Sequence, residues 1–202
     1  MLIFGFDPGE TNSGYAVVVF KPGKAYRLLE IGQIEETIKN LTDKTQKLKV
    51  KRRAKVDKNG KKKPTKFRPE LPPLQIQLPK YYKTISGLFR DHGKPKAVHV
   101  ERFQTRGVKS KSVETVSMMN GVVATICMHR HTDFYTTIAG TWKNLVNKHF
   151  DLEHLYKLAK EIGFTPHEVD AFMIAITRGG KIPPPPMKTV LKALRVYLER
   201  NC

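Results

Sequence analysis

Three short apolar runs at the start of the chain constrain its fold most strongly. Residues 2–6 and 15–20 have the apolar, β-branched composition of strands, and residues 7–14 between them are rich in turn-forming residues. Residues 21–24 form a second turn signal, Lys-Pro-Gly-Lys, and residues 25–34 complete the pattern with a third strand. The sequence therefore predicts an antiparallel three-strand meander.

Alternating helices and strands follow the meander. The apolar spacing predicts helices at 74–93, 112–130, 141–149, 151–162, 166–178 and 187–200, and strands at 97–101 and 134–138. This order predicts an α/β protein with a five-stranded mixed sheet and helices on both faces. We place one domain at 1–180, and a proline-rich linker with a basic helix at 181–202.

The positive charge is concentrated in one segment. The chain has 37 Lys and Arg against 18 Asp and Glu, a net charge of +19. Residues 44–68 hold thirteen of the basic residues and one acid, and lie in a segment, 39–73, that has almost no periodic apolar residues. We interpret 39–73 as a flexible insertion, and the alternative is a solvated linker without function. The charge favours a polyanionic partner, either nucleic acid or an acidic membrane surface.

Composition excludes several other classes of protein. The longest apolar run, 15–20, is too short to span a bilayer, and the start of the chain lacks the basic region of a signal peptide. The two cysteines, Cys127 and Cys202, form neither a metal-binding motif nor a disulfide framework. We therefore expect a soluble intracellular protein without a small-molecule cofactor.

Acidic residues at two strand ends indicate a metal site. Asp7 follows the first strand and Glu101 ends the fourth, and such positions converge on one rim of an α/β sheet. His167 and Asp170 lie three residues apart in a predicted helix, so both side chains face one direction. Clustered carboxylates favour Mg²⁺ or Mn²⁺, and two ions about 4 Å apart suit phosphodiester cleavage.

Structural roles remain open for each of these residues. Asp7 precedes Pro-Gly and could serve only the turn, and Glu101 could pair with Arg102 or Arg106. His167 could lie beside a helix cap, and Asp170 could be solvated. The run Thr-Pro-His-Glu at 165–168 reads as N-cap to N3 of a helix, so we assign Glu168 to a capping box.

Three short blocks in this sequence resemble the RuvC family of Holliday-junction resolvases, which have an RNase H-like fold. Ile-Phe-Gly-Phe-Asp-Pro-Gly at 3–9, continuing to Gly-Tyr-Ala-Val-Val at 14–18, is similar to the family's first strand and hairpin. Val-His-Val-Glu at 98–101 is similar to its second acidic strand, and residues 167–175 to its last helix. The resemblance covers roughly residues 1–34 and 74–180, and the insertion and the C-terminal tail lie outside it.

The resemblance implies a nuclease. Asp7, Glu101, His167 and Asp170 would form a catalytic tetrad that binds two Mg²⁺ ions, with Mn²⁺ as a substitute. The family acts as a homodimer on four-way and other branched DNA, and each subunit makes one of two paired nicks that leave 5′-phosphate ends. His167 stands where an aspartate is commoner, which lowers the negative charge of the cluster.

Further residues are candidate contacts with DNA. The Trp-Lys pair at 142–143 resembles plastid-type and phage-type members, so Lys143 is a candidate catalytic residue that contacts the scissile phosphate, with a surface lysine as the alternative. Phe103 is a candidate for stacking on unpaired bases, and a place in the core fits it equally well. The remaining candidates are basic: Arg102, Arg106, Lys109, Lys111 and Lys148 near the site, and Lys51, Arg52, Arg53, Lys61, Lys62 and Lys63 in the insertion.

Other functions fit parts of the same pattern. The spacing of Asp, Gly, Thr and Gly at 7, 9, 11 and 14 also matches the phosphate loop of the sugar-kinase, actin and Hsp70 superfamily, but those ATPases need two copies of the domain. Two further alternatives are a YqgF-type RNA-processing nuclease on the same fold and a DNA-binding protein without catalytic activity.

Overall fold

A mixed five-stranded sheet forms the centre of the molecule. The computed structural model describes residues 1–9, 12–21, 26–35, 74–102 and 111–201. The sheet contains β1 (Leu2–Asp7), β2 (Asn12–Val19), β3 (Arg27–Glu35), β4 (Ala97–Arg102) and β5 (Asp133–Ile138), in the order β3-β2-β1-β4-β5. The first three strands are antiparallel neighbours, whereas β1, β4 and β5 are parallel. The predicted meander and mixed sheet are confirmed.

The turn after β1 is shorter than the composition predicts. We assigned 7–14 to a turn, but Asp7 pairs with Gly14, and Asn12 already belongs to β2. The antiparallel ladder continues into these polar residues because Ser13 closes the turn itself. Its buried hydroxyl accepts from Gly9 N–H at 3.2 Å and donates to Gly9 C=O at 3.3 Å.

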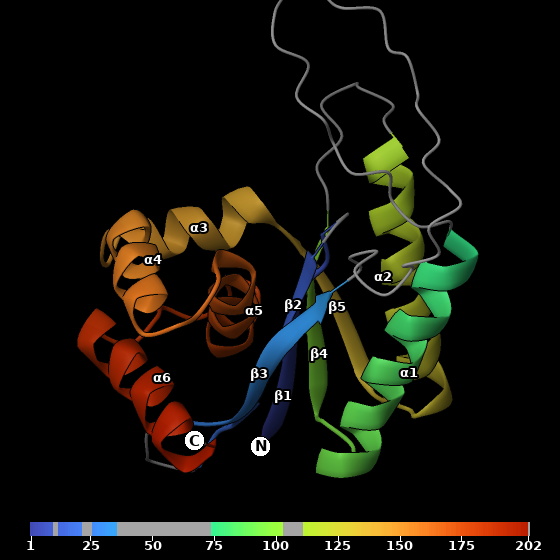
Figure 1. Ribbon diagram of the computed structural model, residues 1–202, viewed down its shortest axis with the longest axis horizontal. Helices are drawn as coiled ribbons and strands as arrows, with labels where there is room; N and C mark the ends of the chain where they lie inside the picture. Colours follow the sequence, from blue (N-terminus) through green and yellow to red (C-terminus); the bar gives the residue numbers. More distant parts are fainter. Residues whose placement is uncertain (10–11, 22–25, 36–73, 103–110, 202) are drawn as a thin grey trace, which may run out of the picture.

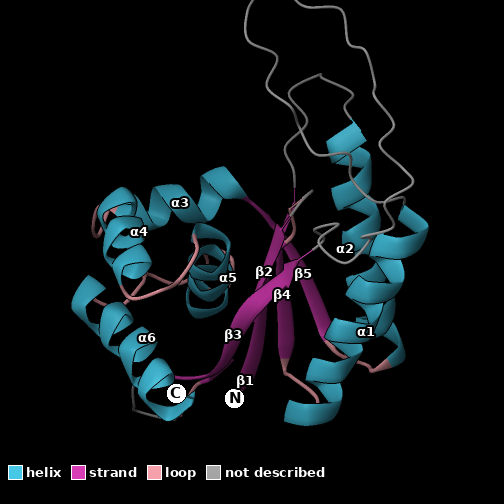
Figure 2. Ribbon diagram, in the orientation of Figure 1, coloured by secondary structure: helices cyan, strands magenta, loops and turns pink. Residues whose placement is uncertain are grey.

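Helices cover both faces of the sheet (Figures 1 and 2). One face carries α1 (Leu74–His92) and α2 (Lys111–His129). The other carries α5 (Pro166–Thr177), with α3 (Ala139–Asn147), α4 (Leu152–Glu161) and α6 (Met187–Asn201) around it. The bounds of these described helices lie within two residues of the predicted bounds. Among the described helices, none combines the length and apolar character needed to cross a membrane.

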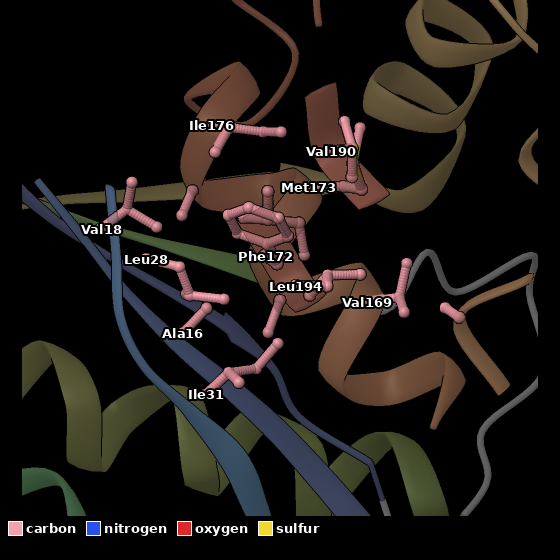
Figure 3. Packing of buried hydrophobic residues seen from close by; sticks show 14 of the residues in the cluster. Ala16, Val18, Leu28, Ile31, Val169, Phe172, Met173, Ile176, Val190 and Leu194 are labelled. Carbon is pink, nitrogen blue, oxygen red and sulfur yellow. The ribbon is translucent and has the colours of Figure 1, made fainter. Parts of the chain in front are cut away.

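Each face of the sheet has its own hydrophobic core. Successive residues of β4 point into opposite cores: Val98 and Val100 pack with α1 and α2, whereas Ala97 packs on the α5 side. The same alternation directs Glu101 to the α5 side. The C-terminal helix α6 contributes Val190 and Leu194, both fully buried, to the α5 core (Figure 3).

Two glycines allow α5 to lie directly on the backbone of the sheet. A Cβ atom at Gly5 would lie 2.2 Å from the carbonyl oxygen of Ala171, and one at Gly14 would lie 1.9 Å from the carbonyl oxygen of His167. Both separations are far inside van der Waals contact, so only glycine fits at these positions. The main-chain contact brings the first turns of α5 next to the end of β1.

The predicted insertion, 39–73, lies outside the described residues, as do Phe103, Arg106 and Lys109. The six basic residues chosen within that insertion therefore stay predictions. Lys111 is the first residue of α2.

Candidate active site

Three carboxylates meet at one rim of the sheet. Asp7 is the last residue of β1 and Glu101 lies near the end of β4, the parallel neighbour of β1. Asp170 reaches the same point from α5. Each of the three offers an oxygen atom, and these oxygens all lie within 4.8 Å of one another. Among the described residues, this set matches the donor geometry of a metal site, as the strand-end pattern predicts.

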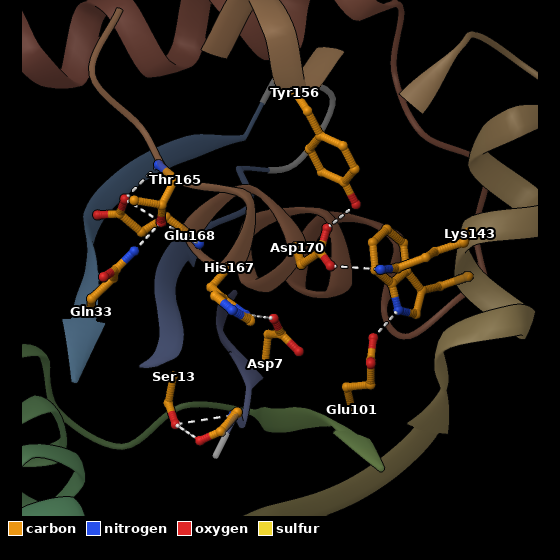
Figure 4. A network of polar contacts seen from close by, with 12 residues as sticks. Asp7, Ser13, Gln33, Glu101, Lys143, Tyr156, Thr165, His167, Glu168 and Asp170 are labelled. Atoms are coloured by element: carbon orange, nitrogen blue, oxygen red, sulfur yellow. Dashed lines mark hydrogen bonds and ion pairs between the residues drawn. The ribbon is translucent and has the colours of Figure 1, made fainter. Parts of the chain in front are cut away.

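The position of Asp170 follows from how α5 begins. Thr165 is the N-cap, Pro166 occupies the first turn, and Glu168 completes a capping box in which its carboxylate accepts from Thr165 N–H at 2.8 Å. The structural role predicted for Glu168 is thus confirmed. With this start, His167 and Asp170 are on the side of the helix that faces Asp7 (Figure 4).

His167 contacts Asp7 directly. Its Nδ1–H donates to Asp7 Oδ2 at 2.6 Å, and this hydrogen bond raises the pKa of His167. Asp7 is 6% exposed, whereas the side chain of His167 is 42% exposed, so water can reach the histidine side of the contact. The structure thus brings all four predicted tetrad residues together, with His167 beside Asp7 and outside the set of three close carboxylates.

Asp170 is held by two donors from the neighbouring helices. Lys143 Nζ of α3 donates to Asp170 Oδ2 at 2.7 Å, and the hydroxyl of Tyr156 of α4 donates to Asp170 Oδ1 (Figure 4). Burial opposes the charge of Lys143, but Asp170 outweighs it and raises the pKa of Lys143. With 6% exposure and two partners, Asp170 is not the solvated residue of the structural alternative.

Glu101 is oriented by a buried tryptophan. Trp142 is fully buried, and its Nε1–H donates to Glu101 Oε2 at 2.8 Å. Within the described part of the chain, Glu101 forms no ion pair with Arg102, which is exposed. The indole therefore fixes the orientation of the Glu101 carboxylate.

The positive charge and hydrogen-bond donors around the cluster do not fully offset the negative charge of the carboxylates. Burial, followed by the charge of Asp7, raises the pKa of Glu101 to about 7. The same two causes raise the pKa of Asp170 to about 6, although Lys143 and Tyr156 act in the opposite direction. Glu101 and Asp170 thus resist ionisation beside Asp7, and a divalent cation would balance the charge of the cluster. An all-oxygen donor set suits Mg²⁺ or Mn²⁺.

Two donors at this site are absent from the sequence predictions. Trp142 has no predicted role beyond its place beside Lys143, and Tyr156 is not predicted at all. The sequence offers one indication for Tyr156: it lies next to Leu155 and Ala159 on the buried side of α4. A tyrosine hydroxyl that is buried needs a polar partner. That partner lies on another helix and could not be identified from local pattern.

The fold that holds this site is shared with solved structures. No protein-family model and no curated protein sequence matches the chain. The structure is similar to that of T. thermophilus RuvC in complex with a Holliday junction substrate, with 18% sequence identity, a TM-score of 0.57 and coverage of 98% of this chain and 96% of that one. The chain has the RuvC fold.

A second RuvC structure, from Thermus thermophilus, gives the same result. Its TM-score is 0.55 at 18% identity, with 87% of this chain and 90% of that chain covered. The RuvC-like architecture confirms the predicted RNase H-like, five-stranded mixed sheet with helices on both faces. At this level of identity the likeness establishes the fold, and the role of each site residue is argued from its own geometry.

Proposed function

We propose that this chain is a metal-dependent endodeoxyribonuclease that cuts Holliday junctions and other branched DNA. The observation that supports it best is the group of three carboxylates, of which Asp7 and Asp170 are buried and Glu101 is half-buried, whose oxygens lie within 4.8 Å of one another at a rim of a RuvC-like sheet. The RuvC structure with 96% of its chain covered was solved with a Holliday junction. A net charge of +19 suits a DNA substrate.

Asp7, Glu101 and Asp170 would hold the metal, with His167 completing the tetrad through Asp7. Two Mg²⁺ ions, or Mn²⁺ in their place, would supply activation of a water molecule and stabilisation of the leaving oxygen. The residues present fit this cofactor, since buried carboxylates with raised pKa values need a cation to ionise fully at neutral pH.

The residues around the carboxylates would position the site and the DNA. Trp142 and Tyr156 hold Glu101 and Asp170 in fixed orientations through single hydrogen bonds. Lys143 contributes a positive charge beside Asp170, with its side chain 34% exposed, where it can contact a phosphate oxygen of the strand. Lys148 and Arg102 are exposed basic residues that would contact the DNA backbone.

The finer features of the activity belong to the same proposal. A homodimer would make paired nicks in two opposed strands and leave 5′-phosphate ends. The basic insertion would add salt-dependent affinity that is independent of DNA sequence, and the domain would extend over 1–180. We expect the protein to act inside a bacterial cell, a phage-infected cell or an organelle.

One set of assays tests the proposal. A four-way junction, a Y-fork and a plain duplex are each incubated with Mg²⁺, Mn²⁺ or EDTA, with structured RNA as a competitor. We expect cleavage of branched DNA with either metal and none in EDTA, and Asp7→Asn should bind the junction without cutting it. Absence of cleavage by the wild type would support a DNA-binding protein instead, and preference for the RNA would support an RNA-processing nuclease.

A further inference from the structure

A pocket lies beside the carboxylate cluster, between α3 and α4. It has a volume of about 520 Å³ and is lined by residues 143, 147–153 and 156. Lys143 and Tyr156 form the wall that it shares with the cluster, since each also donates to Asp170 (Figure 4). A molecule in this pocket would therefore lie next to a phosphate bound at the carboxylates.

We propose that this pocket holds one unpaired nucleotide of the strand to be cut, adjacent to the scissile phosphate. The inference rests on the proposed nuclease function and adds a site that selects its substrate. Pockets of roughly 300–1,000 Å³ accept ligands of about the size of a nucleotide. A base that remains paired in a duplex cannot enter such a pocket. Branch points supply nucleotides that are free to enter.

The lining carries the groups that a nucleotide needs. Lys143 and Lys148 provide positive charge for a phosphate, and half-buried Phe150 provides an aromatic surface for a base. Asn147 is fixed because its Oδ1 accepts from Leu152 N–H at 3.1 Å, which leaves its NH₂ group as a donor. These features suit both halves of a nucleotide.

The charge balance of the lining favours a nucleotide over a simple anion. Asp151 and Glu153 also line the pocket, and their two carboxylates offset the two lysines. Asp151 Oδ1 accepts from Glu153 N–H at 2.9 Å, so that carboxylate is also fixed at the start of α4. Because the acids offset the lysines, free phosphate gains little net attraction here, whereas the amino group of a base can donate to the acids as well.

Binding can be measured without any cleavage. Trp142 is the only tryptophan in the chain, and Lys143 Nζ lies 5.0 Å from the centre of its ring, so a ligand that moves Lys143 changes its fluorescence. The full-length protein is titrated with deoxycytidine 5′-monophosphate, deoxycytidine and inorganic phosphate. We expect the nucleotide to bind about tenfold more tightly than either part, because both halves of the pocket are then filled.

Three variants locate the binding. Lys148→Gln removes an exposed charge and Phe150→Leu keeps an apolar side chain in the core, so both should fold, and each should weaken nucleotide binding about fivefold. Lys157→Gln, an equal charge change on the exposed surface of α4, is the matched control and should leave binding unchanged. Equal affinity for nucleotide and phosphate, or an equal loss in the control, would overturn the proposal.

A junction assay links the pocket to the substrate. Abasic sites are placed one at a time around the cleaved phosphate, and single-turnover cleavage is measured. An abasic site at one position should slow cleavage by the wild type about tenfold. The same abasic site should slow Phe150→Leu much less, because the base and the Phe150 ring form one stacking contact and the variant has already lost it. A uniform response at all positions would contradict the inference while the nuclease function stands. If no branched DNA is cut but the nucleotide still binds in this pocket, the proposed function fails together with the place of the pocket beside a scissile phosphate, and only the nucleotide site remains.

Discussion

The ionisation of Glu101 predicts how stability depends on pH. In metal-free protein its pKa is raised from its ordinary value of 4.5 to about 7, so the folded state holds a proton that the unfolded state releases. The stabilising effect of that proton is complete below pH 4.5 and is lost as the pH rises through 7. At about 1.4 kcal/mol per pKa unit, ionised Glu101 lowers the free energy of unfolding by about 3 kcal/mol at pH 8.

The variant Glu101→Gln isolates this effect. Its amide oxygen can still accept from Trp142 Nε1–H, but the side chain carries no charge. In EDTA at pH 8 the variant should be more stable than the wild type. On lowering the pH to 6, the wild type should regain about 1 kcal/mol relative to the variant, because most Glu101 side chains are then protonated.

Urea unfolding curves at pH 8, 7 and 6 provide the measurement. His99 titrates in the opposite sense, because burial, with Lys181 and Arg178, lowers its pKa to about 4; its effect is common to both proteins and cancels in the difference. Glu114→Gln, at an exposed glutamate of α2, is the control. A difference between wild type and Glu101→Gln that stays constant from pH 8 to 6 would refute the reasoning.

Three further predictions concern the same site. Adding Mg²⁺ at pH 8 should raise the thermal midpoint of the wild type more than that of Asp7→Asn, and equal shifts would argue against a site at Asp7. Tyr156→Phe removes one donor to Asp170 and should slow junction cleavage about tenfold with unchanged junction affinity; a parallel loss of affinity would indicate a different role. Gly14→Ala should destabilise the fold by at least about 2 kcal/mol in urea unfolding, since its Cβ would overlap the carbonyl oxygen of His167, and a neutral effect would contradict the packing described.

Local patterns were sufficient for the sheet, the helices and the three carboxylates. Strand ends are visible in sequence, and parallel strands end at one rim, so Asp7 and Glu101 could be brought together before any coordinates. The cap at Thr165 was equally visible because a capping box involves residues only three positions apart.

Contacts between distant segments could not be predicted in the same way. Trp142 and Glu101 are 41 residues apart, and their hydrogen bond depends on how α3 packs against β5 and α5. The extension of β2 to Asn12 was missed because the composition of 12–14 is typical of a turn, while pairing with β1 decides the outcome. The pocket between α3 and α4 likewise depends on the placement of two helices.

The direct contact of α5 with Gly5 and Gly14 has a consequence for how the site tolerates change. The separation of Asp7 from Asp170 depends on two main chains in contact, since the nearest atoms of α5 at Gly14 are all main-chain atoms, and the side-chain atom nearest Gly5 is the Cβ of the small residue Ala175. Substitutions among the buried residues that lie away from this contact should therefore alter stability well before they alter the spacing of the carboxylates. The spacing of the carboxylates at this rim is set by the backbone, so the geometry of the cluster and the composition of the core can change independently of each other.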